Sequence, residues 1–84
     1  MFSVYVLFSK QYNKIYIGYT SNLESRLLSH NQLSSKGYTK KYRPWDLIYK
    51  QEFELKADAL KRELELKSAR GRKFIREEII PTFQ

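Results

Sequence analysis

The sequence predicts an α+β fold in which helices cover a small three-stranded antiparallel sheet, with the elements in the order ββαβαα. Two segments near the N-terminus, residues 2–8 and 14–19, are rich in β-branched and aromatic residues and are joined by a short polar connection. Residues 56–67 instead place apolar side chains at helical spacing. The 84 residues have room for one compact domain, which we expect to span residues 1–84.

The first two strands form the predicted hairpin. In residues 2–8 the even-numbered side chains fall on one face and the odd-numbered ones on the other, and residues 14–19 alternate in the same way. A two-residue turn near residues 10–11 then places Tyr5 directly opposite Tyr16 on one face of the hairpin.

A helix follows the hairpin. The segment Ser21-Asn22-Leu23-Glu24 is a capping box, in which the Ser21 hydroxyl caps the helix and Glu24 reaches back to the Ser21 amide. The helix ends near residues 31–33. Its predicted buried stripe consists of Leu23, Leu27 and Leu28.

The second half of the chain alternates loop, strand and helices. Residues 34–44 form a basic loop, and residues 45–53 form a third strand. One face of that strand carries Leu47, Tyr49 and Phe53. The helix at 56–67 buries Ala57, Leu60 and Leu64.

The last predicted helix spans residues 69–77, is capped by Ser68, and packs Phe74 and Ile75. Pro81 ends regular structure, which leaves residues 78–84 as a C-terminal tail.

The composition excludes several classes of protein and site. The chain has no cysteine, which excludes disulfides and a cysteine nucleophile, and its single histidine excludes a multi-histidine metal site within one chain. No apolar run approaches the ~20 residues that a membrane span needs. The N-terminus lacks the basic region and cleavage site of a signal peptide. We therefore expect a soluble cytoplasmic protein with no membrane partner.

The charge favours a polyanionic partner. Sixteen Lys and Arg against nine Asp and Glu give a net charge of +7. Residues 36–43 contain four basic residues and no acidic one, and residues 61–76 contain seven basic and two acidic ones. This clustering is more typical of a nucleic-acid footprint than of an evenly solvated surface.

Two pairs of residues have side chains suited to phosphate chemistry. Tyr5 and Tyr16 share a face of the hairpin, and Gly18 marks a place where a ligand or another backbone segment closely approaches the strand. Arg26 and His30 lie one turn apart on the first helix, where Arg can clamp a phosphate and His can transfer protons. Each pair also has a simpler interpretation, because paired tyrosines stabilise sheets and a lone histidine commonly lies on a solvated helix face.

Glu63 is the third candidate, because it lies among the basic residues Lys61, Arg62 and Lys67. It forms either a surface ion pair with Lys67 or a ligand for a hard cation shared with a phosphate.

The segment Ser3-Val4-Tyr5, followed eleven residues later by Tyr16-Ile17-Gly18, resembles the signature of the GIY-YIG endonuclease superfamily. Ser3 and Val4 stand where that family has Gly and Ile. The family's helix Arg, its His and its metal-binding Glu match Arg26, His30 and Glu63.

The resemblance covers residues 2–76 and extends to small stand-alone bacterial members through residues 38–44 and 59–67. It implies a metal-dependent endonuclease that hydrolyses phosphodiester bonds in DNA, in DNA repair or recombination. Glu63 is then the ligand of Mg²⁺ or Mn²⁺.

The resemblance also implies individual catalytic roles. Tyr5 is the base that activates water, Tyr16 and His30 assist proton transfer, and Arg26 clamps the phosphate. A tyrosine with a pKa of ~10 is a poor base at neutral pH unless positive charge lowers that pKa. Arg26, the metal ion and the basic surface are the expected sources of that charge.

The partner is expected to be duplex or branched DNA, bound mainly through its phosphates. The basic residues expected to contact it are Lys36, Lys40, Lys41, Arg43, Arg62, Lys67, Arg70, Arg72 and Lys73. The chain has no room for a further DNA-binding domain, so specificity comes from DNA structure or a partner protein, or is low. The alternatives are a nucleic-acid-binding module with weak or no catalysis, and a protein-interaction domain of the same fold.

Overall fold

The computed structural model describes residues 1–33 and 37–83. Three strands, β1 (Phe2–Ser9), β2 (Lys14–Thr20) and β3 (Asp46–Phe53), form one antiparallel sheet in the order β2-β1-β3. The predicted fold class is confirmed. The central strand is β1, and β2 and β3 are the two edges of the sheet.

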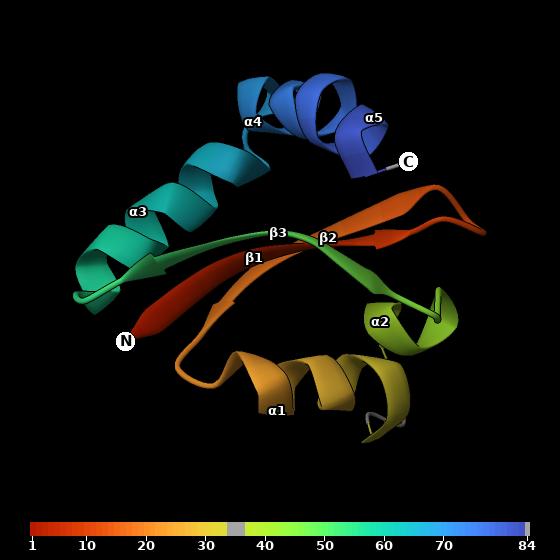
Figure 1. Cartoon of the computed structure of the whole chain (residues 1–84), viewed down its shortest axis with the longest axis horizontal. Coiled ribbons are helices and arrows are strands. Elements are labelled where there is room, and N and C mark those ends of the chain that lie inside the picture. Colours follow the sequence, from red (N-terminus) through yellow and green to blue (C-terminus); the bar gives the residue numbers. More distant parts are fainter. Residues whose placement is uncertain (34–36, 84) are drawn as a thin grey trace.

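Helices cover both faces of the sheet, as Figure 1 shows. One face carries α1 (Leu23–Leu28), its π-helical continuation η1 (Ser29–Leu33) and the short helix α2 (Tyr38–Lys41). The other face carries α3 (Lys56–Lys67), α4 (Ala69–Phe74), η2 (Ile75–Ile79) and α5 (Ile80–Phe83). Among the described residues, no helix combines the length and apolar character that crossing a membrane requires.

The alternation of side chains along β1 produces two cores, one on each face. The larger core lies under α3 and the C-terminal helices, and β1 contributes Val4, Val6 and Phe8 to it. The smaller core lies under α1, where Tyr5 and Leu7 pack with Trp45. The predicted facing of both strands of the hairpin is therefore confirmed.

The turn of the hairpin is longer than predicted, which changes its register. Four residues separate β1 from β2, and the last of them, Asn13, has a φ of 54°. Asparagine tolerates this left-handed conformation better than most residues do. Tyr5 consequently pairs with Gly18, and Tyr16 pairs with Leu7. The predicted direct pairing of Tyr5 with Tyr16 is wrong, because the two tyrosines are diagonal neighbours.

A β-bulge changes the facing of β3. Val6 pairs with Tyr49 while the next residue, Leu7, pairs with Leu47, which leaves Ile48 as the extra residue. Leu47 therefore packs in the smaller core, whereas Tyr49 and Phe53 pack against the larger one. The prediction that all three share a face is wrong for Leu47.

Helix α1 differs from the prediction in its cap and in its buried face, and a short helix lies within the predicted loop. Asn22, not Ser21, caps α1, because its side-chain oxygen accepts a 3.1 Å hydrogen bond from the Ser25 amide. Leu28 is 45% exposed, so it is not part of a buried stripe. The loop predicted over 34–44 contains α2; residues 34–36 lie outside the described part of the chain.

Helix α3 has the predicted bounds but presents a different face to the sheet. Ala59 and Leu66 are buried, whereas Ala57 is exposed and Leu64 is 68% exposed. A row of leucines identifies an apolar stripe, but the small side chain of Ala59 allows the helix to approach the sheet closely. Glu63 lies between the two buried residues at helical spacing, and its side chain is only 12% exposed.

The C-terminal helices pack tightly against α3. Ser68 caps α4 as predicted, since its hydroxyl accepts a 3.1 Å hydrogen bond from the Gly71 amide. A Cβ on Gly71 would overlap the carbonyl oxygen of Glu65, which explains a glycine inside a helix. Ile75 is buried as predicted, but Phe74 is 39% exposed. Pro81 does not end regular structure, because α5 continues to Phe83.

Candidate active site

Tyr5 and His30 form a buried hydrogen-bonded pair in the smaller core. The Tyr5 Oη lies 2.9 Å from the His30 Nε2, and these residues are only 1% and 5% exposed. Tyr5 comes from the central strand and His30 from η1, two residues beyond the end of α1. His30 is therefore not a solvated surface histidine, which was one of the two interpretations of the sequence.

Tyr16 completes a cluster of three rings. Its ring centroid lies 6.3 Å from that of Tyr5, in a stacked arrangement, and 4.7 Å from that of His30. The diagonal register of the hairpin allows this contact, since long side chains reach diagonal neighbours on one face of a sheet. Three of the five predicted catalytic residues thus lie in direct contact.

Gly18 is required by the position of Tyr5. A Cβ built on Gly18 would lie 2.7 Å from the Tyr5 Oη and 2.9 Å from its Cζ. The Tyr5 ring therefore crosses the edge strand β2 at the one residue with no side chain. The close approach expected at Gly18 is present, but the approaching group is the Tyr5 phenol and not a ligand or another backbone segment.

Electrostatics favour neutral forms of both Tyr5 and His30. Burial raises the pKa of Tyr5 well above 10, with further increases from Tyr16 and Glu63, while Arg26 acts in the opposite direction. Burial also lowers the pKa of His30 below 6.5, and the positive charges of Arg26 and Arg43 lower it further. At neutral pH the pair is a phenol and a neutral imidazole, and the imidazole tautomer decides which of them donates the hydrogen bond.

Arg26 and Glu63 approach this cluster from opposite layers of the molecule. Arg26 is exposed on α1, and its charge acts on both Tyr5 and His30. Glu63 comes from α3 on the other face of the sheet, and its negative charge raises the pKa of Tyr5. Its carboxylate lies 3.3 Å from the Lys67 ammonium, so the predicted ion pair is present.

A shallow pocket of about 340 Å³ lies along β2 beside this cluster. It is lined by Ile15, Tyr16, Ile17, Tyr38, Lys67 and Arg72. Residues from both faces of the sheet line it, because it straddles the edge of β2. Tyr38 is a lining residue that was not predicted, although it begins residues 38–44, through which the sequence resembles the small bacterial members of the family.

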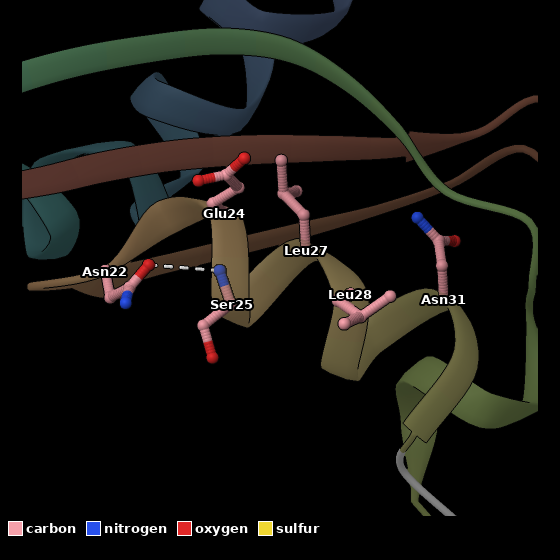
Figure 2. Close-up of a pocket in the computed structure, with 6 residues that line it drawn as sticks. All are labelled: Asn22, Glu24, Ser25, Leu27, Leu28 and Asn31. Atoms are coloured by element: carbon pink, nitrogen blue, oxygen red, sulfur yellow. Dashed lines mark hydrogen bonds between the residues drawn. The ribbon is translucent and has the colours of Figure 1, made fainter.

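A larger hollow of about 630 Å³ lies along α1 and is lined by other residues (Figure 2). It is lined by Asn22, Glu24, Ser25, Leu27, Leu28 and Asn31. The drawn side chains include the helix cap and apolar groups, and none belongs to the predicted site. Size alone therefore does not identify the reactive region.

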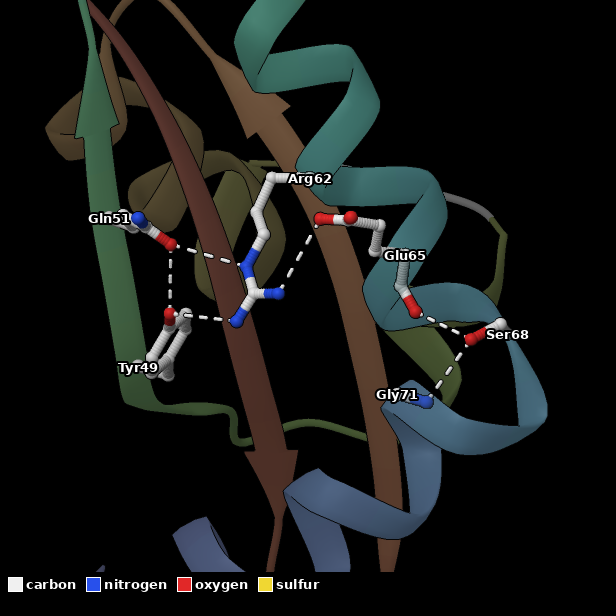
Figure 3. Close-up of polar contacts among 6 residues, drawn as sticks. All are labelled: Tyr49, Gln51, Arg62, Glu65, Ser68 and Gly71. Carbon is white, nitrogen blue, oxygen red and sulfur yellow. Dashed lines mark hydrogen bonds and ion pairs between the residues drawn. The ribbon is translucent and has the colours of Figure 1, made fainter.

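Several of the predicted DNA-contacting residues also make contacts within the protein. Arg62 extends from α3 toward β3, where it contacts Tyr49 and Gln51, and it also forms an ion pair with Glu65 of α3 (Figure 3). Arg43 donates hydrogen bonds of 2.6 and 3.3 Å to the carbonyls of His30 and Ser29, so it supports the start of η1.

Of the other residues predicted to contact DNA, two make contacts within the protein and three are exposed. Arg72 donates to the Lys67 carbonyl at 3.0 Å, and Lys73 lies 3.9 Å from Glu77. Lys40, Lys41 and Arg70 are exposed. Lys36 lies outside the described residues.

Comparison with known proteins identifies the class to which this fold and site belong. Residues 1–76 match the family model described as the GIY-YIG catalytic domain. The chain therefore belongs to the GIY-YIG family, and this membership places it among nucleases.

The most informative relatives are small proteins of similar length. A UPF0213 protein of Staphylococcus haemolyticus is 42% identical over 65 residues, which are 77% of this chain and 78% of the relative. A UPF0213 protein of Staphylococcus saprophyticus is 38% identical with the same coverage. The solution NMR structure of a UPF0213 protein from Bacillus halodurans is similar with a TM-score of 0.57 and 28% identity, over 98% of this chain and 90% of that one.

Proposed function

We propose that the protein is a divalent-metal-dependent endonuclease that hydrolyses phosphodiester bonds in DNA. The observation that carries this proposal is the buried 2.9 Å hydrogen bond between Tyr5 and His30, beside Tyr16 and within electrostatic reach of Arg26 and Glu63. Family membership supports the nuclease class. A stabilising aromatic core alone does not need a histidine and two charged groups around one phenol.

Tyr5 is the group that activates the attacking water, and His30 takes the proton that Tyr5 releases. Because burial keeps the phenol protonated, its oxygen can accept a proton from water only as its own proton leaves. The lowered pKa of His30 leaves it neutral near pH 7, with a lone pair on Nε2 in one tautomer. Tyr16, whose ring packs against both, assists this transfer.

The bond changes follow from that proton transfer. The water oxygen bonds to phosphorus, the P–O bond to the leaving oxygen breaks, and solvent protonates the leaving oxygen. Arg26, exposed and one turn from His30, binds the phosphate oxygens and offsets the charge that develops on them.

Glu63 is suited to hold the metal ion. Mg²⁺ is commonly bound by one or two carboxylates, with its remaining ligands from water and substrate phosphate. Glu63 supplies one carboxylate, which already lies next to the cationic Lys67 ammonium. Among the described residues no group of three or more His, Asp or Glu side chains could hold a metal ion together, so a cation here would take its other ligands from water and DNA. When bound, Mg²⁺ or Mn²⁺ would polarise the phosphodiester.

The DNA is held mainly through its phosphates. Lys67 and Arg72 line the pocket beside Tyr16, and Lys40, Lys41, Arg70 and Lys73 are further exposed cations that can contact phosphates. Such contacts do not read base sequence. We propose that the protein cleaves duplex or branched DNA in the cytoplasm during repair or recombination, with specificity from DNA structure or a partner protein.

The proposal is tested by incubating purified protein with linear, nicked and branched DNA, in Mg²⁺, in Mn²⁺ and with a chelator. We expect cleavage of at least one substrate that the chelator abolishes. Tyr5→Phe removes only the hydroxyl and should lower the rate by about 100-fold or more. Tyr19→Phe is the matched control, since Tyr19 packs on the opposite face of β2.

Two results would contradict the proposal. If the wild type binds all three DNA forms but cleaves none in either metal, the protein is a nucleic-acid-binding module. If Tyr5→Phe cleaves as fast as the wild type, Tyr5 is a structural residue only.

A further inference from the structure

A row of aromatic rings leads from the candidate active site to the surface. The Tyr38 ring lies 6.3 Å from that of Tyr16, the Tyr42 ring lies 4.9 Å from that of Tyr38, and the Tyr12 ring lies 5.5 Å from that of Tyr42. These centroid distances are typical of rings in contact. We call Tyr12, Tyr38 and Tyr42 the aromatic surface.

The aromatic surface is open to solvent although it adjoins a core. Tyr12 is 44% exposed and Tyr38 is 45% exposed, while Tyr42 is half-buried. Trp45, which Tyr38 stacks against at 5.8 Å, is already buried. Covering Trp45 therefore accounts for one face of Tyr38 but not for three neighbouring rings at the surface.

The rings of the aromatic surface are also held in place. The Tyr38 hydroxyl donates a 3.3 Å hydrogen bond to the Ile15 carbonyl of β2. Tyr42 is contacted edge-on by both Tyr12 and Tyr38. A flat group that stacks here loses little side-chain entropy from the protein, because the rings are already ordered.

Positive charge surrounds the aromatic surface. The Lys14 and Lys41 ammonium groups each lie 5.4 Å from the centroid of the Tyr42 ring. On the side of the active site, Lys67 and Arg72 line the same pocket as Tyr38. An apolar protein partner would have to bury these cations without counter-charges, whereas a nucleotide supplies both a flat ring and an anion.

We propose that the aromatic surface stacks unpaired nucleobases of the DNA substrate, next to the phosphate bound at Tyr16 and Arg26. A base within a duplex has both faces covered by its neighbours, so only an unpaired base can stack on these rings. This inference rests on the proposed function and narrows it, because the preferred substrate then contains single-stranded nucleotides beside the cleaved bond.

The test is a binding measurement made with the metal chelated, so that it does not depend on cleavage. The probes are a thymidine oligonucleotide and an oligonucleotide of the same length and charge whose sugars lack bases. We expect the wild type to bind the thymidine probe at least about fivefold more tightly, because only that probe can stack. Equal dissociation constants for the two probes would overturn the inference, whether or not the protein cleaves DNA.

Variants locate the preference. Tyr42→Leu and Tyr38→Leu should each reduce the ratio of the two dissociation constants toward one. Tyr38→Phe keeps the ring and should retain the preference for the thymidine probe. Phe83→Leu is the matched control, because Phe83 is also 44% exposed but lines a different hollow, together with Leu47 and Ile48. A preference lost equally in Phe83→Leu would contradict the assignment to the aromatic surface. A preference that follows the tyrosines in a protein that cleaves no DNA would support this inference while contradicting the proposed nuclease activity.

Discussion

Burial and positive charge act in opposite directions on Tyr5. The sequence suggested that neighbouring cations would lower its pKa enough for it to act as a base. Arg26 does act in that direction, but burial of the ring is the larger effect and the pKa of Tyr5 is raised. The hydrogen bond to His30 offers a different solution, because a phenol that passes its proton on does not need to ionise first.

The buried imidazole of His30 makes stability depend on pH. Its pKa lies below the 6.5 of an unfolded chain, so the unfolded state binds a proton first as the pH falls. Stability that is fully present above pH 6.5 should therefore be lost as the pH falls through the folded-state pKa. Thermal melting between pH 7.5 and 5.5 should show this decrease in the wild type. His30→Gln, which remains neutral, should show a flatter profile; identical profiles would mean that His30 is not buried as described.

At the scale of single elements, β2 carries a steric requirement that affects the site directly. Gly18→Ala places a methyl group 2.7 Å from the Tyr5 Oη, and Tyr5 is held by His30 and cannot easily move. We expect a loss of stability of about 1–3 kcal/mol, together with slower cleavage. Melting temperature and cleavage rate are the measurements.

A double-mutant cycle separates this clash from a general effect on the strand. In a Tyr5→Leu background the same Gly18→Ala change should lower the stability by clearly less, because the Tyr5 ring and its hydroxyl are gone. Additive costs in the two backgrounds would show that Gly18 does not contact Tyr5.

The same elements show how much the sequence predicts. The hairpin, α3 and the Ser68 cap follow from local patterns, since propensity, side-chain alternation and capping act within a few residues. The β3 bulge and the buried face of α3 do not, because each depends on what packs against it. A run of leucines cannot indicate that Ala59 faces the sheet.

The candidate site divides in the same way. Its residue types were predictable from motif spacing, and the hairpin face shared by Tyr5 and Tyr16 followed from alternation. The Tyr5–His30 hydrogen bond spans 25 residues of sequence and needed the fold. Tyr38 reaches the site because α2 lies against the edge of β2, which no local pattern predicts.

Across the whole molecule, the two basic stretches meet at the edge of β2. Tyr38 of α2 shares a pocket with Lys67 and Arg72, so residues from both stretches face one surface. Lys40→Ala with Lys41→Ala should weaken binding to all DNA sequences alike and reduce the log–log salt slope by about 2 units, since each phosphate contact contributes about 0.9.

The matched control for this measurement changes two exposed lysines elsewhere. Lys50 and Lys56 lie on β3 and at the start of α3, and replacing both with alanine removes the same charge. Equal slopes for the two double variants would mean that α2 does not contact the DNA.

The central claim is that Glu63 and the buried tyrosine–histidine pair form one metal-dependent active site. Glu63→Gln removes the carboxylate charge and preserves the size of the side chain. Folding should change by less than about 1 kcal/mol, because the lost contact is a single ion pair with the half-exposed Lys67. Glu65→Gln is the matched control, since Glu65 is 54% exposed and pairs with Arg62 on the other side of α3.

The most direct measurement compares cleavage of branched DNA in Mg²⁺ by the wild type, Glu63→Gln and Glu65→Gln, with melting and DNA binding recorded on the same preparations. We expect Glu63→Gln to fold and bind DNA but not to cleave it, because the ligand of the metal ion is gone. Glu65→Gln should cleave as the wild type does. A folded Glu63→Gln variant that cleaves as fast as the wild type would contradict the account.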